Sequence, residues 1–215
     1  MTRLYLVRHG ETEWNKASKI QGRTDTELSS YGLEQAKKLA ERLAVEDISV
    51  IYSSSLQRAL KTAKIIAEHK SCGIYESEAY HEIRLGPWEG MTMNEIQEKY
   101  GDHLLTYRDD PANFKLPGAE TFEQLTERTY RAILEIVARH SGSNILLVSH
   151  GTTIKAAIIR ILGIDINNYN KFKIDNASIS VIDFYGDTVE KPVIYCLNDT
   201  SHLKEAQSDR KGWFL

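Results

Sequence analysis

The sequence has little cysteine and no long apolar run. Its two cysteines, Cys72 and Cys196, are too few for a disulfide framework or a zinc knuckle, so we expect both to be small buried or half-buried residues. No stretch approaches the length of a membrane-spanning helix, and the opening "MTRLYLV" lacks the basic region and cleavage site of a signal peptide. These absences predict a cytoplasmic protein without membrane contact.

An excess of charge of one sign is also absent. The 27 Lys and Arg residues nearly balance the 30 Asp and Glu residues, giving a net charge of -3 without a long run of either sign. Because a nucleic-acid-binding surface needs a basic excess, we expect no nucleic acid and a small-molecule partner instead. The G-x-x-x-x-G-K-[ST], G-x-G-x-x-G and H-E-x-x-H motifs are missing, as is a cysteine closely followed by arginine. We therefore expect neither a metal nor another cofactor.

Three short apolar runs, rich in β-branched residues, stand out from the rest of the chain. They cover residues 4–7, 50–52 and 145–148, and each is followed within a few residues by a helix-like segment. Strands that alternate with helices indicate a mostly parallel α/β sheet. Near the end, "ASISVIDFY" alternates, Gly186 and Asp187 supply a turn, and "KPVIYCLN" follows, which predicts a hairpin at a sheet edge. With 41% apolar residues in 215, we expect one domain, residues 1–215.

Three segments have the periodicity of amphipathic helices. The first is capped by Ser29 or Ser30, the second follows "SSSL", and the third begins at a capping box of Thr121 and Gln124 and ends near "HSGS". The apolar positions expected to face the core are Leu33, Ala36, Leu39, Ala40 and Leu43, then Leu60, Ala63, Ile66 and Ala67, then Phe122, Leu125, Ala132, Ile133, Ile136 and Val137. Between residues 80 and 120 the pattern weakens and three of the four prolines occur, which predicts a cover segment over one end of the sheet.

Two of the apolar runs lead into a histidine followed by glycine. "LYLVRHG" brings Arg8 and His9 to the end of one strand, and "ILLVSHG" brings His150 to the end of another. The carboxyl ends of parallel strands form the usual ligand crevice of an α/β sheet, and Arg58 lies in the first turn of a helix that follows a third strand. Such a group of cationic side chains needs an anion, and arginine forks match phosphate oxygens. The residues therefore predict a phosphate ligand, with ordinary core or surface roles for the remaining histidines, which are His69, His81, His103, His140 and His202.

The motifs "VRHGETEWN", "SLQRALKTA", "HEIRLGPWEG" and "VSHGTT", in this order, extend over almost the whole chain. Together they resemble the histidine phosphatase superfamily, in the branch that includes the cofactor-dependent phosphoglycerate mutases. The segments "QGRTDTELSSYG", "LPGAETFEQL" and "LNDTSHL" are most similar to the small bacterial broad-specificity phosphatases described as phosphoglycerate-mutase-like. The resemblance implies a three-layer sandwich, with a mostly parallel central sheet, helices on both faces and a C-terminal edge hairpin.

The resemblance also implies roles for individual residues. His9 would be the nucleophile, Arg8, Arg58 and His150 would complete the phosphate pocket, and Glu82 would donate and accept the proton. Further contacts to the phosphate or its neighbouring atoms are implied for Asn15, Gln21, Gly22, Gly151 and Thr152. The implied reaction is metal-independent hydrolysis of a small phosphorylated metabolite through a phosphohistidine intermediate.

Other functions stay open on the sequence. A phosphoglycerate mutase uses the same pocket but returns the phosphoryl group to another oxygen; in the cover segment, Lys99, Arg108 and Lys115 lie among several acids, which favours hydrolysis. An α-ribazole-type phosphatase is an alternative of the same reaction class. A non-catalytic phosphate-binding module would be expected to lack the nucleophile, an arginine or the acid. Whether the chain forms a homodimer is also open.

Overall fold

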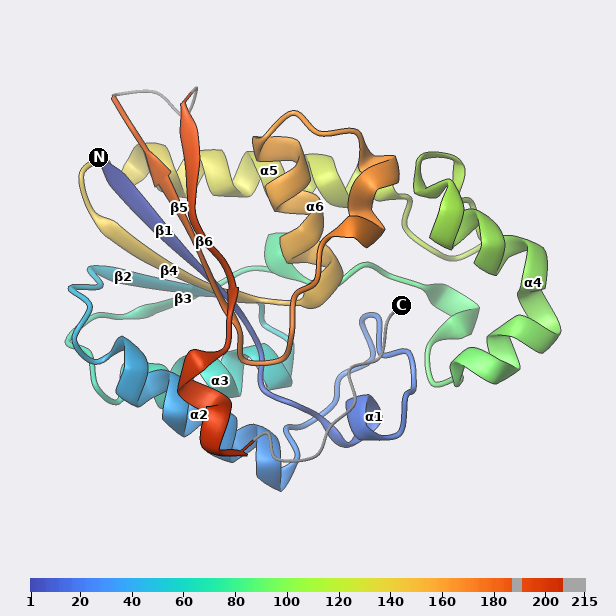
Figure 1. Ribbon diagram of the computed structural model, residues 1–215, viewed down its shortest axis with the longest axis horizontal. Helices are drawn as coiled ribbons and strands as arrows, with labels where there is room; N and C mark the ends of the chain where they lie inside the picture. The colour runs from blue at the N-terminus through green and yellow to red at the C-terminus, as the bar shows by residue number, and fades with distance from the viewer. Residues whose placement is uncertain (187–190, 207–215) are drawn as a thin grey trace.

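A six-stranded sheet forms the centre of the computed structural model, which describes residues 1–186 and 191–206 (Figure 1). The strand order is β3-β2-β4-β1-β5-β6. Neighbours among the first four strands are parallel, whereas β5 is antiparallel to β1 and β6 is antiparallel to β5. The strands are β1 (Thr2–Arg8), β2 (Val50–Ser53), β3 (Ile74–Glu76), β4 (Asn144–Ser149), β5 (Ile179–Phe184) and β6 (Pro192–Asp199). The mostly parallel sheet and the edge hairpin are confirmed, although Asp187 of the expected turn lies outside the described residues.

Helices cover both faces of the sheet. In Figure 1, α2 (Ser30–Leu43) and α3 (Gln57–Ala67) lie below it, and α5 (Phe122–Arg139) and α6 (Gly151–Ile161) lie above it. Alternate side chains of a strand point to opposite faces. Accordingly, Tyr5 and Val7 of β1 pack in the apolar cluster with α2 and α3, and their neighbours in β1 pack in the cluster with α5 and α6. The three-layer arrangement is therefore confirmed.

The helix starts follow the capping residues that the sequence indicates. Ser29 caps α2, where its hydroxyl accepts the Gly32 N–H at 3.0 Å. The capping box of α5 is present, with Gln124 N donating to Thr121 Oγ1 at 3.2 Å and Thr121 N to Gln124 Oε1 at 3.0 Å. All the apolar positions expected in the core of α2, α3 and α5 are buried, except Leu33 and Ala67, which are half-buried.

One long helix that the sequence pattern did not predict, α4 (Met93–Asp109), lies within residues 80–120. Its start carries a capping box, in which Glu95 N donates to Thr92 Oγ1 at 3.3 Å and Thr92 N to Glu95 Oε2 at 2.7 Å. The helix buries only Ile96 and Leu104, and its backbone is non-helical at Tyr100. The apolar period is therefore too weak to be read from the sequence.

A third apolar cluster lies beneath this segment. Trp88 is 1% exposed and its ring lies against Tyr100, Tyr107 and Phe114, as expected for a packing residue. The cluster also includes Phe122 and Leu125 of α5 and Ala156 and Ile159 of α6. Residues 80–120 are thus packed onto the layer of α5 and α6.

The remaining elements are short. They are α1 (Glu13–Lys16) and the 3₁₀ helices η1 (Glu78–Tyr80), η2 (Gly86–Trp88), η3 (Pro111–Asn113), η4 (Ile166–Lys171) and η5 (Ser201–Ala206). Cys72 and Cys196 are free and half-buried. Within residues 1–186 and 191–206, no helix has the length and apolar character that crossing a bilayer requires.

Candidate active site

The ends of β1 and β4 bring two histidines side by side. The strands pair in parallel with Arg8 opposite Ser149, and the His9 N–H donates to the Ser149 carbonyl at 3.0 Å. The next residues, His9 and His150, are both buried, and their ring centroids lie 5.2 Å apart. The repeated strand-His-Gly pattern therefore yields a pair of imidazoles at the carboxyl end of the sheet.

The His9 ring has a defined proton position. Its Nδ1 lies 2.7 Å from the carbonyl oxygen of Gly10. A carbonyl oxygen can only accept a hydrogen bond, so Nδ1 carries the proton and the neutral ring keeps its lone pair on Nε2. Burial lowers the pKa of His9 well below its usual value, and the charges of Arg58 and Arg8 lower it further. At neutral pH, His9 is therefore an uncharged ring with a nucleophilic Nε2.

Arg58 enters the site from the first turn of α3 and is 1% exposed. Its Nη1 donates to the Thr24 carbonyl at 2.9 Å and its Nη2 to the Gly22 carbonyl at 2.7 Å. Burial lowers the pKa of Arg58 to about 10, so the guanidinium still carries its charge at neutral pH. The loop that precedes α2 thus fixes this cation through backbone contacts rather than through an ion pair.

Three buried nitrogens around His9 have no hydrogen-bond partner among the described residues. They are Arg8 Nε, Arg58 Nε and His150 Nδ1. Arg8 Nη1 is engaged with the Ile174 carbonyl at 2.6 Å, and His150 Nε2 lies 2.7 Å from Ser54 Oγ. A buried polar group without a partner is costly, and an anion with several acceptor oxygens satisfies both arginine Nε–H groups, and also His150 Nδ1 in the tautomer in which Ser54 Oγ donates to Nε2. Two guanidinium groups with free donors beside a neutral imidazole form a phosphate-binding arrangement.

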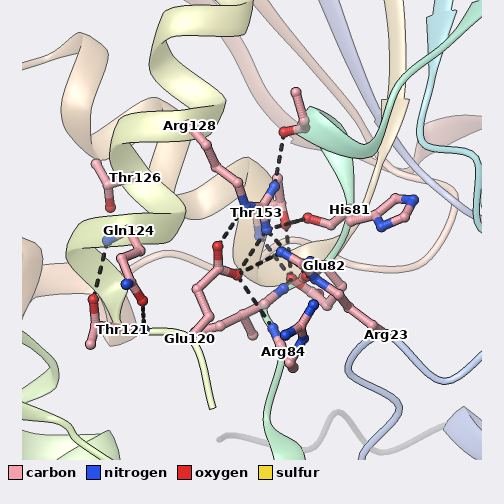
Figure 2. A network of polar contacts seen from close by, with 12 residues as sticks. Arg23, His81, Glu82, Arg84, Glu120, Thr121, Gln124, Thr126, Arg128 and Thr153 are labelled. Atoms are coloured by element: carbon pink, nitrogen blue, oxygen red, sulfur yellow. Dashed lines mark hydrogen bonds and ion pairs between the residues drawn. The ribbon is translucent and has the colours of Figure 1, made fainter. Parts of the chain in front are cut away.

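Glu82 lies at the N-terminus of α6. Its Oε1 accepts the Thr153 N–H at 3.1 Å and the Thr153 hydroxyl at 3.0 Å (Figure 2). Its Oε2 accepts the Thr152 N–H at 3.1 Å. His150, the N-cap residue of α6, makes no capping bond with its side chain, so Glu82 serves the first N–H groups of the helix instead. The negative charge of Glu82 raises the pKa of both Arg8 and Arg58, against the larger lowering by burial. In this structure, the Thr152 N–H is therefore engaged with Glu82.

Two glycines allow close approach in the site. Gly22 has φ +52°, and a Cβ on it would lie 2.3 Å from Glu89 Oε1. A Cβ on Gly151 would lie 3.3 Å from Cζ of Arg8, so the missing side chain lets the Arg8 guanidinium rest against the first turn of α6. Backbone conformation requires the first glycine, and contact with the Arg8 guanidinium favours the second.

The side chains of Asn15 and Gln21 have local partners. Asn15 Oδ1 accepts the Thr12 N–H and hydroxyl, both at 3.1 Å, and forms the capping box of α1. Gln21 Oε1 accepts the Thr26 hydroxyl at 2.6 Å. Both residues lie on the segment between β1 and α2, and their amide oxygens stabilise its turns.

Two residues outside the predicted set, Asn176 and Lys155, also adjoin the site. Asn176 Nδ2 donates to the His9 carbonyl at 3.1 Å, across 167 positions of sequence. Lys155 Nζ lies 4.6 Å from the centroid of the Tyr169 ring, and burial, followed by the charge of Arg8, lowers the pKa of Lys155 to about 8. One signal for Lys155 was available, because it follows Gly151 by four positions and so shares its helix face.

His81 lies next to the site but belongs to none of the predicted roles. His81 is 9% exposed, and its Nε2 lies 2.7 Å from Ser55 Oγ, next to the serine that contacts His150. Across the described part of the chain, the structure has no group of three or more His, Cys, Asp or Glu side chains placed to hold a metal ion.

Comparisons with known proteins give a consistent picture. A family model of the histidine phosphatase superfamily (branch 1) matches residues 4–200. Phosphoserine phosphatase 1 of Hydrogenobacter thermophilus is 37% identical over 205 residues, which cover 95% of this chain and 96% of that protein. A probable phosphoglycerate mutase, GpmB of Proteus mirabilis, is 33% identical over 214 residues, covering 97% and 98%. Among solved structures, the chain is similar to phosphoserine phosphatase of Entamoeba histolytica, solved as a histidine-to-alanine variant in complex with phosphoserine. The TM-score is 0.83 and the identity 34%, over 94% of this chain and all of that one.

Proposed function

The chain belongs to branch 1 of the histidine phosphatase superfamily and is a phosphomonoester hydrolase, and we propose that it acts through His9 on small phosphorylated metabolites such as phosphoserine. The single observation that carries this proposal is the bond from His9 Nδ1 to the Gly10 carbonyl. It leaves Nε2 with a lone pair beside two guanidinium groups that have free donors. Phosphoserine is chosen because similar proteins are named for, or solved with, that compound.

In the first half-reaction, His9 Nε2 attacks phosphorus and forms a P–N bond while the P–O bond to the leaving group breaks. Arg8, Arg58 and His150 hold the phosphoryl oxygens, whose charge grows during transfer. Glu82 passes a proton to the departing alkoxide, which leaves as an alcohol. A phosphomonoester binds a proton near pH 6, so its monoanion is one source of that proton.

In the second half-reaction, Glu82 takes a proton from a water molecule that attacks the phosphohistidine. The new P–O bond forms as the P–N bond breaks, and neutral His9 and inorganic phosphate result. One carboxyl group thus serves both steps, first as acid and then as base. The placement of Glu82 against the first turn of α6, next to His150, supports this double role.

Hydrolysis is favoured over mutase chemistry by the cover segment. A mutase must retain a bisphosphorylated intermediate, which requires cations turned toward the pocket. All Lys and Arg residues between positions 80 and 120, which are Arg84, Lys99, Arg108 and Lys115, are exposed to solvent. None of these four cations is buried in the pocket, which supports hydrolysis over retention of such an intermediate.

Phosphorus NMR in the presence of a chelator tests this function. The protein is incubated with phosphoserine and, separately, with 3-phosphoglycerate plus catalytic 2,3-bisphosphoglycerate, beside a His9→Ala control. We expect His9-dependent release of inorganic phosphate. Conversion to 2-phosphoglycerate without release of inorganic phosphate would instead make the protein a mutase. Failure of the wild type to convert any ester would contradict catalysis.

The proposal also covers the organisation of the chain. Residues 1–215 form one domain in which residues 80–120 cover the active site, and the apolar cluster that joins this segment to α5 and α6 supports this organisation. The cytoplasmic location stays a prediction of the sequence.

A further inference from the structure

A half-buried group of charges lies beside Glu82 and consists of Arg23, Glu120 and Arg128, which we name the Glu120 clamp (Figure 2). Glu120 Oε1 accepts Arg128 Nε at 2.6 Å, and Glu120 Oε2 accepts Arg128 Nη2 at 3.0 Å. The same Oε2 accepts Arg23 Nη2 at 3.2 Å. The Glu120 side chain is only 10% exposed. Two guanidinium groups therefore share one carboxylate largely away from water.

The clamp is charged although it is partly shielded from water. Burial raises the pKa of Glu120, but the hydrogen bond from Arg128 and the charges of Arg128 and Arg23 outweigh it, so this pKa lies below its usual value. Removing charges from water often costs as much as their pairing returns, so a buried ion pair is weak evidence for stability. A role in positioning explains the clamp better.

The contacts of Arg128 identify what is positioned. Its Nη1 donates to the Ala79 carbonyl at 2.8 Å, and its Nη2 donates to the His81 carbonyl at 2.8 Å and the Glu82 carbonyl at 3.2 Å. Residues 81–85 belong to no helix or strand, so no regular ladder of backbone hydrogen bonds fixes them. The guanidinium of Arg128 instead holds this segment by donating to its backbone carbonyls.

Contacts from two other sides complete the arrangement. Arg23 Nε donates to the Glu82 carbonyl at 3.2 Å, so two guanidinium groups converge on one backbone oxygen. From α6, Thr153 Oγ1 lies 2.9 Å from the His81 carbonyl and 3.0 Å from Glu82 Oε1. The backbone of Glu82 is therefore held by the clamp, and its carboxylate by the first turn of α6.

The clamp also joins Glu82 to the phosphate pocket. Arg23 directly follows Gly22, whose carbonyl accepts Arg58 Nη2. The Arg23 N–H donates to Glu89 Oε1 at 3.2 Å, and the same oxygen accepts the Leu85 N–H at 2.9 Å. One oxygen of Glu89 thus links the two loops.

We propose that Arg128, acting with Glu120 and Arg23, is a positioning residue that holds Glu82 at the distance from the phosphate pocket that protonation of the leaving group requires. This inference rests on the proposed function, in which Glu82 is the acid and base. The side chain of Arg128 bonds to Glu120 and to backbone carbonyls, so we expect it to act on the reaction through Glu82. Its effect therefore depends on how much a substrate needs the proton that Glu82 supplies.

The test compares two leaving groups. Phosphoserine releases an alkoxide that needs a proton, whereas p-nitrophenyl phosphate releases a weakly basic phenolate that leaves without one. For Arg128→Met, we expect kcat/KM for phosphoserine to fall by about 10- to 100-fold, because misplacement by about 1 Å costs up to about 100-fold. For p-nitrophenyl phosphate, kcat/KM should fall less than about threefold, because this constant reports steps only up to the first phosphoryl transfer.

Matched variants separate positioning from a merely structural role. Arg131→Met removes an arginine from the same helix that is 73% exposed and paired with Glu127. This variant should leave kcat/KM unchanged for both substrates. Arg128→Lys keeps a positive charge beside Glu120 but cannot bond three carbonyls and a carboxylate at once. Its kcat/KM should therefore also fall more for phosphoserine than for p-nitrophenyl phosphate, but by less than in Arg128→Met. It also serves as the folded alternative should Arg128→Met fail to fold.

A double-mutant cycle with Glu82→Gln gives the decisive outcome. If Arg128 acts through Glu82, Arg128→Met should cause less than about a threefold further loss on phosphoserine in the Glu82→Gln background. Equal losses on both substrates, or a full further loss in that background, would overturn the inference. If Glu82→Gln lowers kcat/KM more for phosphoserine than for p-nitrophenyl phosphate and neither Arg128 variant does so, the inference fails while the proposed function stands. Inactivity of the wild type would be a failure of the proposed function itself.

Discussion

Replacement of Arg58 by methionine removes the most completely buried cation of the phosphate pocket while keeping an unbranched side chain. The guanidinium is 1% exposed and donates to the carbonyls of Gly22 and Thr24. Loss of one donor to a developing oxyanion costs about 3 kcal/mol in the transition state, so kcat/KM should fall by about 100- to 1000-fold. The two carbonyls also lose their donors, which should lower the free energy of unfolding by about 2 kcal/mol, or Tm by roughly 4 to 8 °C.

Steady-state kinetics on phosphoserine and thermal unfolding measure the two effects separately. Arg58→Lys should lie between the wild type and Arg58→Met in activity, because it keeps the charge but not the planar fork. Arg42→Met is the control, since Arg42 is exposed on α2 and pairs only with Glu46 in the described structure. A loss of less than about fivefold in kcat/KM for Arg58→Met would refute the assignment of Arg58 to the phosphoryl group.

Two further predictions concern stability. Burial, reinforced by nearby charge, holds the pKa of His9 and of His150 well below the usual value. Below pH 6.5 the unfolded chain therefore binds protons that the folded protein does not, so the free energy of unfolding rises with pH. At pH 5.5, each buried neutral ring lowers this free energy by about 1.4 kcal/mol. Scanning calorimetry should give a lower Tm at pH 5.5 than at pH 7.5, and His9→Asn should reduce this difference; an equal Tm at both pH values would contradict the buried neutral rings. Gly22→Ala should cost about 1 to 2 kcal/mol in urea unfolding, because φ is +52° and the new Cβ would meet Glu89. Gly73→Ala, where a Cβ meets nothing within 4 Å, should be nearly neutral, and equal losses for the two variants would count against the strain at Gly22.

The parts of the site that strands deliver were predictable from the sequence. An apolar run followed by His-Gly occurs twice, and parallel strands end at the same edge of a sheet. Sequence alone could not show that the two strands are neighbours. The pairing of β1 with β4 shows it, and it places the rings of His9 and His150 5.2 Å apart.

Contacts between distant segments were not predictable. The clamp joins Arg23 to Glu120 across 97 positions, and Arg128 reaches the Ala79 carbonyl across 49. In the sequence, each of these charges is typical of a solvated surface residue. Only the fold shows that three of them meet beside Glu82.

Helix α4 was missed for a different reason. Its capping box of Thr92 and Glu95 was present in the sequence, but few of its side chains are buried. A helix that covers the edge of a domain needs no continuous apolar stripe, so the hydrophobic period is a poor signal for it. In such segments, capping residues indicate a helix more clearly than periodicity does.

Trapping of the covalent intermediate tests the nucleophilic role of His9 most directly. The protein is mixed with phosphoserine, quenched with alkali after a few milliseconds, and analysed by intact mass and peptide mapping. We predict one phosphoryl group per chain, stable to base and labile to acid, on the peptide that carries His9, and none in His9→Asn. A phosphoryl group on another residue, or turnover at the wild-type rate in His9→Asn, would contradict the account.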